Sequence, residues 1–582
     1  MAKSSRRVSV AFALALALGL SACGGGGGGG GGGGTAPAPT VPTTPTPPPA
    51  PVGISDPEAG RFLTQATFGV TDPDIETLKA STYAAWLTQQ MALAPSASHQ
   101  THVENRLVAL RVTNANATLS ANQFYESFWG QAATGPDQLR QRVKFALSQI
   151  FVISLNDANV DVRGAASYYD MLGANAFGNF RSLLENVTLH PMMGIYLTSL
   201  ANQKEDDRTG RHPDENYARE VMQLMSIGLY SLNTDGSYKL DASGNPIPSY
   251  TAEDISNLAK VFTGMSWYHP APTNSTFFGG SRDANATVRP MILYSNYHSI
   301  SAKTFLGVTI PATTTPDPAG DIKIALDTIF NHPNVGPFIA KRLIQQLVTS
   351  NPSAGYVGRV AAAFNNNGSG TRGDMAAVVR AVLTDAEARD STTAAGATYG
   401  KLREPIVRMA NWMRSFDARS TSGSFLLTST SASTSLGQSP LAANSVFNFY
   451  RPGYVPPNTR LGTQNLTAPE FQIVDEVSVA GYLNTLQTTI NTGIGSSNDV
   501  RSTYAAEVAI ANDPTALVER VNRLLLYGQM SATLKARIVE AVTGVAIPGG
   551  TATQAQIDAA RLNRAKLAIF MAMASPDYLT QR

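Results

Sequence analysis

Cysteine is almost absent from this sequence: Cys23 is the only one in 582 residues. A lone thiol has no partner for a disulfide within the chain, although disulfides are common in oxidising compartments. A chain of this length buries enough surface to be stable without them. If Cys23 is modified, no thiol remains for a thiolate metal site or a cysteine nucleophile.

An excess of charge of one sign is also missing. Lys and Arg number 44 against 42 Asp and Glu. Nucleic-acid-binding domains carry a basic patch and a high pI, so we expect no nucleic-acid partner. After the N-terminal segment no apolar run reaches the length of a membrane span. The Gly-x-Ser-x-Gly elbow and the glycine patterns of nucleotide-binding loops are absent as well.

The N-terminal segment predicts export and lipid attachment. A short basic stretch precedes a mostly apolar run at 8–20, which is too short to span a membrane. The sequence Leu-Ser-Ala-Cys at 20–23 resembles a lipobox, which implies removal of residues 1–22 as a signal peptide and acylation of Cys23. The alternative is an ordinary signal peptide with an incidental cysteine. Gly24 is not the aspartate that retains lipoproteins in the inner membrane, so we expect lipid anchoring in the cell envelope, at the outer membrane.

Residues 23–54 are expected to form a tether. Eleven consecutive glycines at 24–34 are followed by a Thr/Ala/Pro-rich stretch at 35–51. Glycine-rich chains are flexible coils, and proline-rich chains prefer the extended polyproline II conformation. We therefore expect a spacer between the membrane and the folded part.

Helical periodicity dominates from residue 55 onward and predicts a mainly α fold. Thr251, with Asp254 three residues on, resembles a capping box. We expect a large helical body over 55–419, followed by a Ser/Thr-rich loop and a C-terminal helical lobe over 420–582, in one continuous domain or two. The Asp-Gly and Ser-Gly-Asn turn signals at 234–250 predict a small hairpin excursion.

The densest polar cluster is RHPDENYARE at 211–220. On a helix, Glu215 and Arg219 lie on one face, as do Asn216 and Glu220. One interpretation is an ordinary ion pair between Glu215 and Arg219. The other is a catalytic site, in which Glu215 or Glu220 is a general base or metal ligand and Asn216 and Arg219 bind substrate.

Histidine supplies the remaining candidates. Four of the seven histidines precede proline, a pattern typical of helix starts. In the catalytic interpretation, His190 joins Glu215 and Glu220, and His190, His298 and His332 bind a divalent metal. The spacing is not that of a known zinc signature, so neither the presence nor the identity of a metal follows from the sequence.

Several segments together resemble one bacterial family, the domain-of-unknown-function family 1800, over essentially residues 55–582. They are RFLTQATFG (61–69), LRQRVKFALSQIFV (139–152), HPMMGIYL (190–197), ENYAREVMQL (215–224), YTAEDISNLAKVFTG (250–264), HPNVGPFIAKRLIQQLV (332–348), KLREPIVR (401–408) and SPDYLTQR (575–582). The resemblance implies an exported protein whose partner is a sulfatase-like exported protein of family 1501. It implies no reaction. Asp214 and Ser299 replace an Asn and an Asp of the family pattern, which weakens a catalytic role for His298.

Two functions are consistent with these features. The first is a helical binding or scaffold module, anchored in the envelope by lipid and working with an exported partner. The alternative is a cell-surface hydrolase that uses a His/Glu site, with or without a metal, on an envelope or extracellular polymer.

Overall fold

The computed structural model describes residues 53–582. The predicted signal peptide, Cys23 and the tether up to residue 52 lie outside the described residues. Among the helices of residues 53–582, none has the length and apolar character that crossing a bilayer requires.

The first helices are short and begin at side chains that cap them. Ser55 and Glu58 form a capping box at the start of the first helix, where the Ser55 N–H donates to Glu58 Oε2 over 2.9 Å. The helices of this part are α1 (Asp56–Ala66), α2 (Asp72–Lys79), α3 (Tyr83–Ala92), α4 (His99–Thr113), α5 (Ala121–Thr134), α6 (Gln138–Ser148), α7 (Val162–Ala174), α8 (Phe180–Leu189), α9 (Pro191–Tyr196) and α10 (Asn216–Gln223).

The middle of the chain continues as helices. The predicted capping box is present, since the Thr251 N–H donates to Asp254 Oδ2 over 2.7 Å at the start of α11. The elements are α11 (Ala252–Val261), α12 (Asn274–Phe277), η1 (Ser295–Tyr297), α13 (Pro318–Asn331), α14 (Val335–Leu347), α15 (Ala354–Asn365), α16 (Met375–Thr384), α17 (Ala386–Arg389), α18 (Ser391–Ala394) and α19 (Pro405–Ser415). The prediction of a mainly α fold is confirmed.

The strands of residues 53–582 form only two-stranded antiparallel pairs. These pairs are β1 (Met265–Ser266) with β2 (Ile292–Leu293), β3 (Lys303–Phe305) with β4 (Val308–Ile310), β5 (Lys401–Leu402) with β8 (Thr580–Gln581), and β6 (Arg419–Ser420) with β7 (Val500–Arg501). The β5–β8 pair, with Lys401 opposite Gln581, places the end of the chain beside residues 401–402.

Residues 229–249 form the small excursion that the turn signals predict. Its chain segments pair through isolated antiparallel bridges and form no regular strands. Two of these bridges join Tyr230 to Pro248 and Leu232 to Tyr238. The second turn is closed by Asp241, whose Oδ1 accepts hydrogen bonds from the N–H groups of Ser243 and Asn245.

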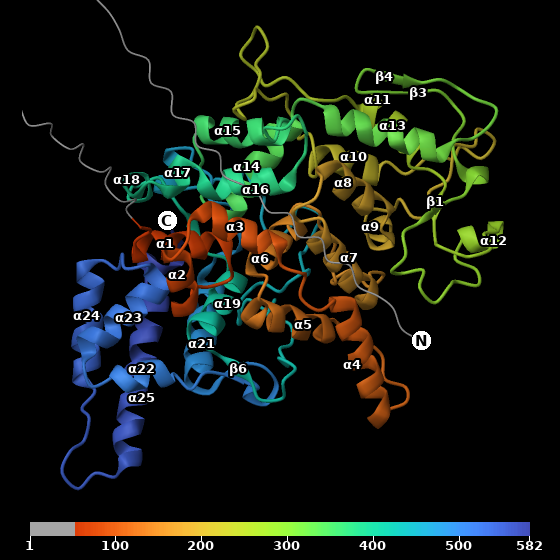
Figure 1. Cartoon of the computed structure of the whole chain (residues 1–582). Helices are drawn as coiled ribbons and strands as arrows, with labels where there is room; N and C mark the ends of the chain where they lie inside the picture. The colour runs from red at the N-terminus through yellow and green to blue at the C-terminus, as the bar shows by residue number, and fades with distance from the viewer. Residues whose placement is uncertain (1–52) are drawn as a thin grey trace, which may run out of the picture. The chain divides into compact units, whose positions relative to one another are not determined.

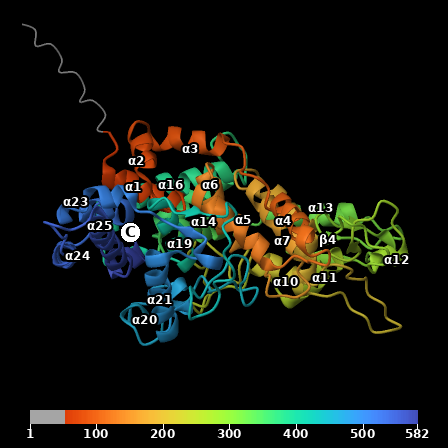
Figure 2. The same ribbon diagram turned by 90° about the horizontal axis from the view of Figure 1, so that it is seen from below.

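The C-terminal helices pack against the first ones. Arg523 Nε lies 2.7 Å from Asp56 Oδ2, and α23 lies beside α1 (Figure 1). Seen from below, α23–α25 and α12 stand at opposite ends (Figure 2). The elements are α20 (Arg460–Thr463), η2 (Pro469–Ile473), α21 (Glu476–Thr492), η3 (Ser496–Asn498), α22 (Ala505–Ile510), α23 (Pro514–Leu526), α24 (Ala532–Gly544), α25 (Gln554–Met573) and α26 (Pro576–Leu579). Residues 53–582 form one compact unit with a continuous core from Ala59 to Tyr578.

Candidate functional site

The predicted site residues at and near α10 lie in two different environments: Glu215 and Arg219 are on the surface, and Glu220 is buried. Arg219 Nη2 lies 3.0 Å from Glu215 Oε2, and the two side chains are 44% and 41% exposed. This contact is the exposed ion pair of the first interpretation of the 211–220 segment. Asn216 is the first residue of α10, and its N–H donates to Asp214 Oδ1 over 2.8 Å. Glu220 is buried with Oε2 unpartnered, and burial raises its pKa.

His190 is a buried helix cap. It ends α8 and begins α9, and its Nδ1 accepts a hydrogen bond from the Met192 N–H over 3.2 Å. The imidazole packs edge-on against the Tyr168 ring, and its Nε2 has no partner. Burial lowers the pKa of His190 to about 3, so the ring is neutral at physiological pH. The helix-start interpretation of this His-Pro pair is confirmed.

His298 and His332 have other surroundings. His298 Nδ1 lies 2.9 Å from the Thr263 carbonyl oxygen, and Nε2 lies 2.9 Å from Asp321 Oδ2, so both ring nitrogens are engaged. His332 Nδ1 accepts a hydrogen bond from the Asn334 N–H over 3.2 Å. Burial, with help from nearby cations, lowers the pKa of His332 to about 4.

The predicted metal site is not assembled in this structure. Within residues 53–582 there is no group of three or more His, Cys, Asp or Glu side chains arranged to hold a metal ion. His190, His298 and His332 have separate hydrogen-bond partners, and no two of the rings share one. The donor set that a divalent metal needs is therefore missing around them.

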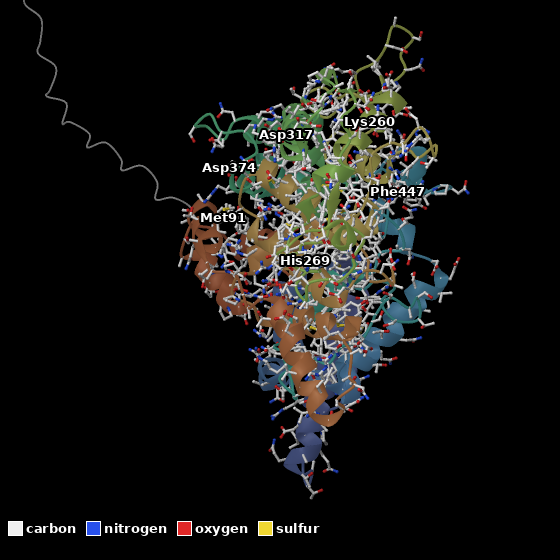
Figure 3. All side chains as sticks on the ribbon, turned by 90° about the vertical axis from the view of Figure 1, so that its right-hand side faces the viewer. Met91, Lys260, His269, Asp317, Asp374 and Phe447 are labelled. Carbon is white, nitrogen blue, oxygen red and sulfur yellow. The ribbon has the colours of Figure 1, made fainter. Side chains whose placement is uncertain are left out.

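A cavity of about 420 Å³ opens at another place, between the end of α10, the excursion, α14 and the loop before and after α20. Phe447, labelled in Figure 3, is part of its wall. This volume falls in the range of small-molecule sites. Within the described part of the chain, none of the predicted site residues lines it.

The cavity is cationic. Its lining includes Lys341 and Arg342 from α14 and Arg451 from the segment before α20. No carboxylate of the described residues lines it. None of the three forms an ion pair within residues 53–582. The Arg342 Nη1 donates to Gln345 Oε1 over 3.2 Å. Burial lowers the pKa of Arg342 to about 10, which leaves the guanidinium charged at neutral pH. Uncompensated cations in a hollow attract anions.

Exposed apolar side chains surround the cations. Leu229, Tyr230, Tyr238 and Phe447 line the cavity, and each is more than a third exposed. The two tyrosine rings meet edge-on with centroids 5.3 Å apart. Contiguous exposed apolar surface marks binding sites more often than isolated apolar residues do.

A smaller chamber of about 50 Å³ adjoins the cavity. The residues that line both are Leu224, Arg342, Gln345, Phe447 and Pro452. Behind this shared wall, the chamber is lined by Gln149, Gln346, Tyr450 and Glu470. Its volume suffices for a few water-sized groups.

A buried ion cluster reaches the chamber through Glu470, which is part of the chamber lining. Lys401 Nζ lies 3.0 Å from Glu470 Oε1 and 4.0 Å from Glu404 Oε1, and it donates to the Gln346 carbonyl oxygen over 2.9 Å. The three charged side chains are at most 2% exposed. Burial raises the pKa of Glu470 against the opposing effect of Lys401.

Gln149 connects the cluster to the chamber. Its Nε2 donates to Glu404 Oε2 over 2.8 Å, and its Oε1 accepts from Tyr450 Oη and Asn448 Nδ2, each at 2.9 Å. These bonds hold the amide in one orientation. Because the side chain is buried and both its amide nitrogen and its amide oxygen are hydrogen-bonded, it fixes Tyr450 at the chamber wall.

Two oxygen atoms of the chamber lining are left without a partner in the described structure. They are Glu470 Oε2 and Gln346 Oε1, on side chains that are 2% and 8% exposed. A buried polar atom without a hydrogen bond costs about 1–3 kcal/mol. Both atoms are enclosed by protein and have almost no accessible surface of their own.

Asn334 holds the cavity wall in place. Its Nδ2 donates to the carbonyl oxygens of Ile227 over 3.0 Å and Tyr230 over 2.8 Å, and its Oδ1 accepts from the Leu232 N–H over 2.9 Å. The start of α14 is thereby fastened to residues 227–232, which the cavity needs as one of its sides.

Sequence reasoning missed this site because it followed histidines and the acid-rich segment. The residues of α6 lie outside the cavity and the chamber and are all buried, although Arg140, Arg142 and Lys144 are among them. Charged residues are rarely fully buried unless they are paired. Arg142 and Gln149 belong to segment 139–152, one of those quoted for the family resemblance.

Comparison with known proteins identifies the family but no characterised relative. No curated protein and no solved structure matches the chain. The sequence model of the family described as protein of unknown function (DUF1800) matches residues 61–580. The match covers nearly all of the described residues, including every residue of the cavity, the chamber and the ion cluster. The chain therefore belongs to the DUF1800 family of proteins of unknown function.

Proposed function

We propose that this protein is an exported, lipid-anchored binding module of the cell envelope that captures an anionic ligand in the cavity between α10 and α14. The observation that carries the proposal is the grouping of Lys341, Arg342 and Arg451 around a hollow of ligand size with no carboxylate in its lining among the described residues. The whole chain is nearly neutral, so this grouping is not the consequence of a general excess of base.

The exposed aromatic side chains that line the cavity favour a ligand with an apolar part. Tyr230, Tyr238 and Phe447 present exposed ring surface beside the cations. Aromatic side chains contribute large contact areas at small entropic cost. The preferred ligand therefore joins an anionic group to a body with a flat or apolar face.

Anchoring follows from the N-terminal sequence. Acylation of Cys23 attaches the protein to the outer membrane, and the tether that follows carries the folded part away from the bilayer. In this position the sulfatase-like exported protein of family 1501 is the proposed partner. The hydrolase alternative has less support, because Glu215 is in an exposed ion pair and His190 is a neutral buried cap.

The proposal is tested by calorimetry on the full-length protein in detergent. The probes are naphthalenetrisulfonate, tetragalacturonate and the neutral maltotetraose. We expect both anions to bind and the neutral sugar to bind at least tenfold more weakly. Arg342→Gln removes a charged hydrogen-bond donor worth about 1.5–3 kcal/mol, so it should weaken both anions tenfold or more.

The matched control is Arg419→Gln in β6, whose side chain is 64% exposed and lies outside the cavity lining. It should leave both affinities within twofold. Equal binding of the neutral sugar, or equal loss in the two variants, would overturn the proposal.

A further inference from the structure

A second hollow lies away from the cationic cavity. It is an apolar pocket of about 290 Å³, lined by residues of α19, η2, α21 and α26. None of its lining residues in the described part of the chain belongs to the cavity or the chamber. Phe471 and Val479 line it and are 38% and 48% exposed, so the pocket opens at the surface. Its volume is at the lower end of the range of small-molecule sites.

Arg408 is the charged residue of this lining. Apart from Ser478, Tyr482 and Thr580, the other described lining residues are apolar, and no carboxylate is among them. The Arg408 side chain is buried, with the residue 6% exposed, and it forms no ion pair within residues 53–582. An otherwise apolar pocket therefore holds one cation.

The guanidinium group of Arg408 is fixed through one nitrogen and free at the other two. Its Nε donates to the Arg403 carbonyl oxygen over 2.7 Å, and its central carbon lies 4.6 Å from the centre of the Tyr482 ring. Nη1 and Nη2 have no acceptor in residues 53–582, yet neither is enclosed by protein, in contrast to Nε and Nη2 of Arg403. Both Nη atoms of Arg408 therefore keep accessible surface.

This buried cation lacks a counter-charge. A buried charge is costly unless it is paired, and arginine stays charged in proteins. Burial lowers the pKa of Arg408, and the neighbouring cation Arg403 acts in the same direction. The contact with the Tyr482 ring offsets part of the charge, but it gives Nη1 and Nη2 no acceptor. An anionic group beside Arg408 supplies both the charge and the acceptors.

We propose that the apolar pocket binds a free fatty acid, with the carboxylate at Arg408 and the alkyl chain along the apolar lining. A carboxylate is planar and accepts two hydrogen bonds from one guanidinium group. Leu402, Leu436 and Leu579 are among the side chains that then cover the alkyl chain. The site is additional to the cationic cavity and does not depend on the function proposed for that cavity.

Other ligand classes satisfy only part of the pocket. A free sulfate or phosphate ion pairs with Arg408 but leaves the apolar lining uncovered. A neutral alkyl compound covers the lining but leaves the cation unpaired, and an amphiphilic cation is repelled by it. At about 30 Å³ for a water-sized group, the volume of 290 Å³ holds about ten such groups, which is about the size of octanoate.

Calorimetry compares octanoate with the shorter hexanoate and the neutral octanol. The protein is the full chain carrying Cys23→Ser, studied without detergent, which would compete for the pocket, and stripped of bound lipid on a hydrophobic resin. Each buried methylene group contributes about fourfold in affinity, so hexanoate should bind roughly fifteenfold more weakly than octanoate. Octanol, which cannot pair with the cation, should bind at least tenfold more weakly.

Arg408→Gln should weaken octanoate tenfold or more and change octanol by less than twofold, because it removes the charge and keeps the apolar lining. Thermal unfolding shows whether this variant is folded. Val479→Asp tests the pocket without altering the buried arginine. It places a carboxylate in the apolar lining and should also weaken octanoate tenfold or more.

The matched control is Val477→Asp. Val477 is 51% exposed and lies on the same helix, but it is outside the pocket lining. Both substitutions are at the start of α21, where an acidic side chain is favourable, so both variants should fold. The control should leave the octanoate affinity within twofold.

If octanol binds as tightly as octanoate, the pocket takes a neutral alkyl chain and the fatty-acid inference is wrong. Equal weakening by Val477→Asp and Val479→Asp, or no binding of octanoate to the lipid-free chain, also overturns it. None of these results bears on anion binding through Arg342, which lines the other cavity.

Discussion

Lys401 Nζ lies 3.0 Å from Glu470 Oε1, which joins β5 to η2 in the interior of the protein. Both side chains are 2% exposed, and Glu404 Oε1 lies 4.0 Å from the same ammonium group. Ions at this depth are kept only when they are paired, because desolvation of a lone charge is costly. The pair therefore fixes the loop that carries Glu470 to the wall of the chamber.

Lys401→Met should destabilise the protein strongly. Removing one partner of a buried ion pair typically costs about 3–5 kcal/mol, because the other charge stays buried without compensation. Urea unfolding at pH 8 measures the loss. The loss should be smaller at pH 5, since a protonated Glu470 needs no counter-charge and burial already raises its pKa. A variant within about 1 kcal/mol of wild type at pH 8 would contradict the assignment.

Glu215→Ala should have almost no effect on stability. Its ion pair with Arg219 is exposed, and such pairs on a helix contribute about 0.3–0.5 kcal/mol. Urea unfolding in low and high salt should show a small difference that salt removes. The same variant should bind the anionic probes normally. A large loss of binding would restore the catalytic or substrate-binding role that the sequence predicts for Glu215 and Arg219.

Acid should destabilise the protein through His190. Burial lowers its pKa in the folded state to about 3, below the ordinary value of 6.5. The unfolded chain therefore binds a proton that the folded one does not, and stability falls by roughly 1.4 kcal/mol per pH unit as the pH drops below 6.5. His190→Asn keeps a helix-capping side chain without this titration.

The difference in unfolding free energy between wild type and His190→Asn should shrink by roughly 3 kcal/mol between pH 7 and pH 4. Using the difference removes the contribution of carboxyl groups, which titrate alike in both proteins. A difference that stays constant with pH would show that His190 is solvated or charged in the folded state.

Asn334→Ala should loosen the cavity. It removes three hydrogen bonds to residues 227–232 and leaves buried backbone groups unpaired, at a cost of about 1–3 kcal/mol. Calorimetry should also show weaker binding of naphthalenetrisulfonate, because the wall is no longer held. Asn331→Ala, at the exposed last residue of α13, is the control and should change neither quantity.

Cys23→Ser should release the protein from the membrane. Without the thiol no lipid can be attached, and the described helices supply no bilayer crossing. Fractionation of cells should move the protein from the membrane to the soluble envelope fraction, and labelling with a radioactive fatty acid should be lost. Continued membrane association of the variant would contradict lipid anchoring.

The sequence by itself determined the mainly α class, the capping box at Thr251 and Asp254, and the helix start at His190. These features depend on residues within one or two turns of each other, so local periodicity and capping chemistry reveal them. The excursion with its turn at Asp241 could be predicted for the same reason.

Only the tertiary structure decided where the charges lie. Glu215 and Glu220 are five residues apart, yet one is on the surface and the other is buried, because the packing around α10 covers one side of the helix. Lys401 and Glu470 meet although α19, β6 and α20 lie between them in the sequence, and no local pattern specifies the contact. A charged residue in a sequence carries no mark of burial, since its environment is built by distant segments. The candidate site consists of such residues, so the fold was needed to find it.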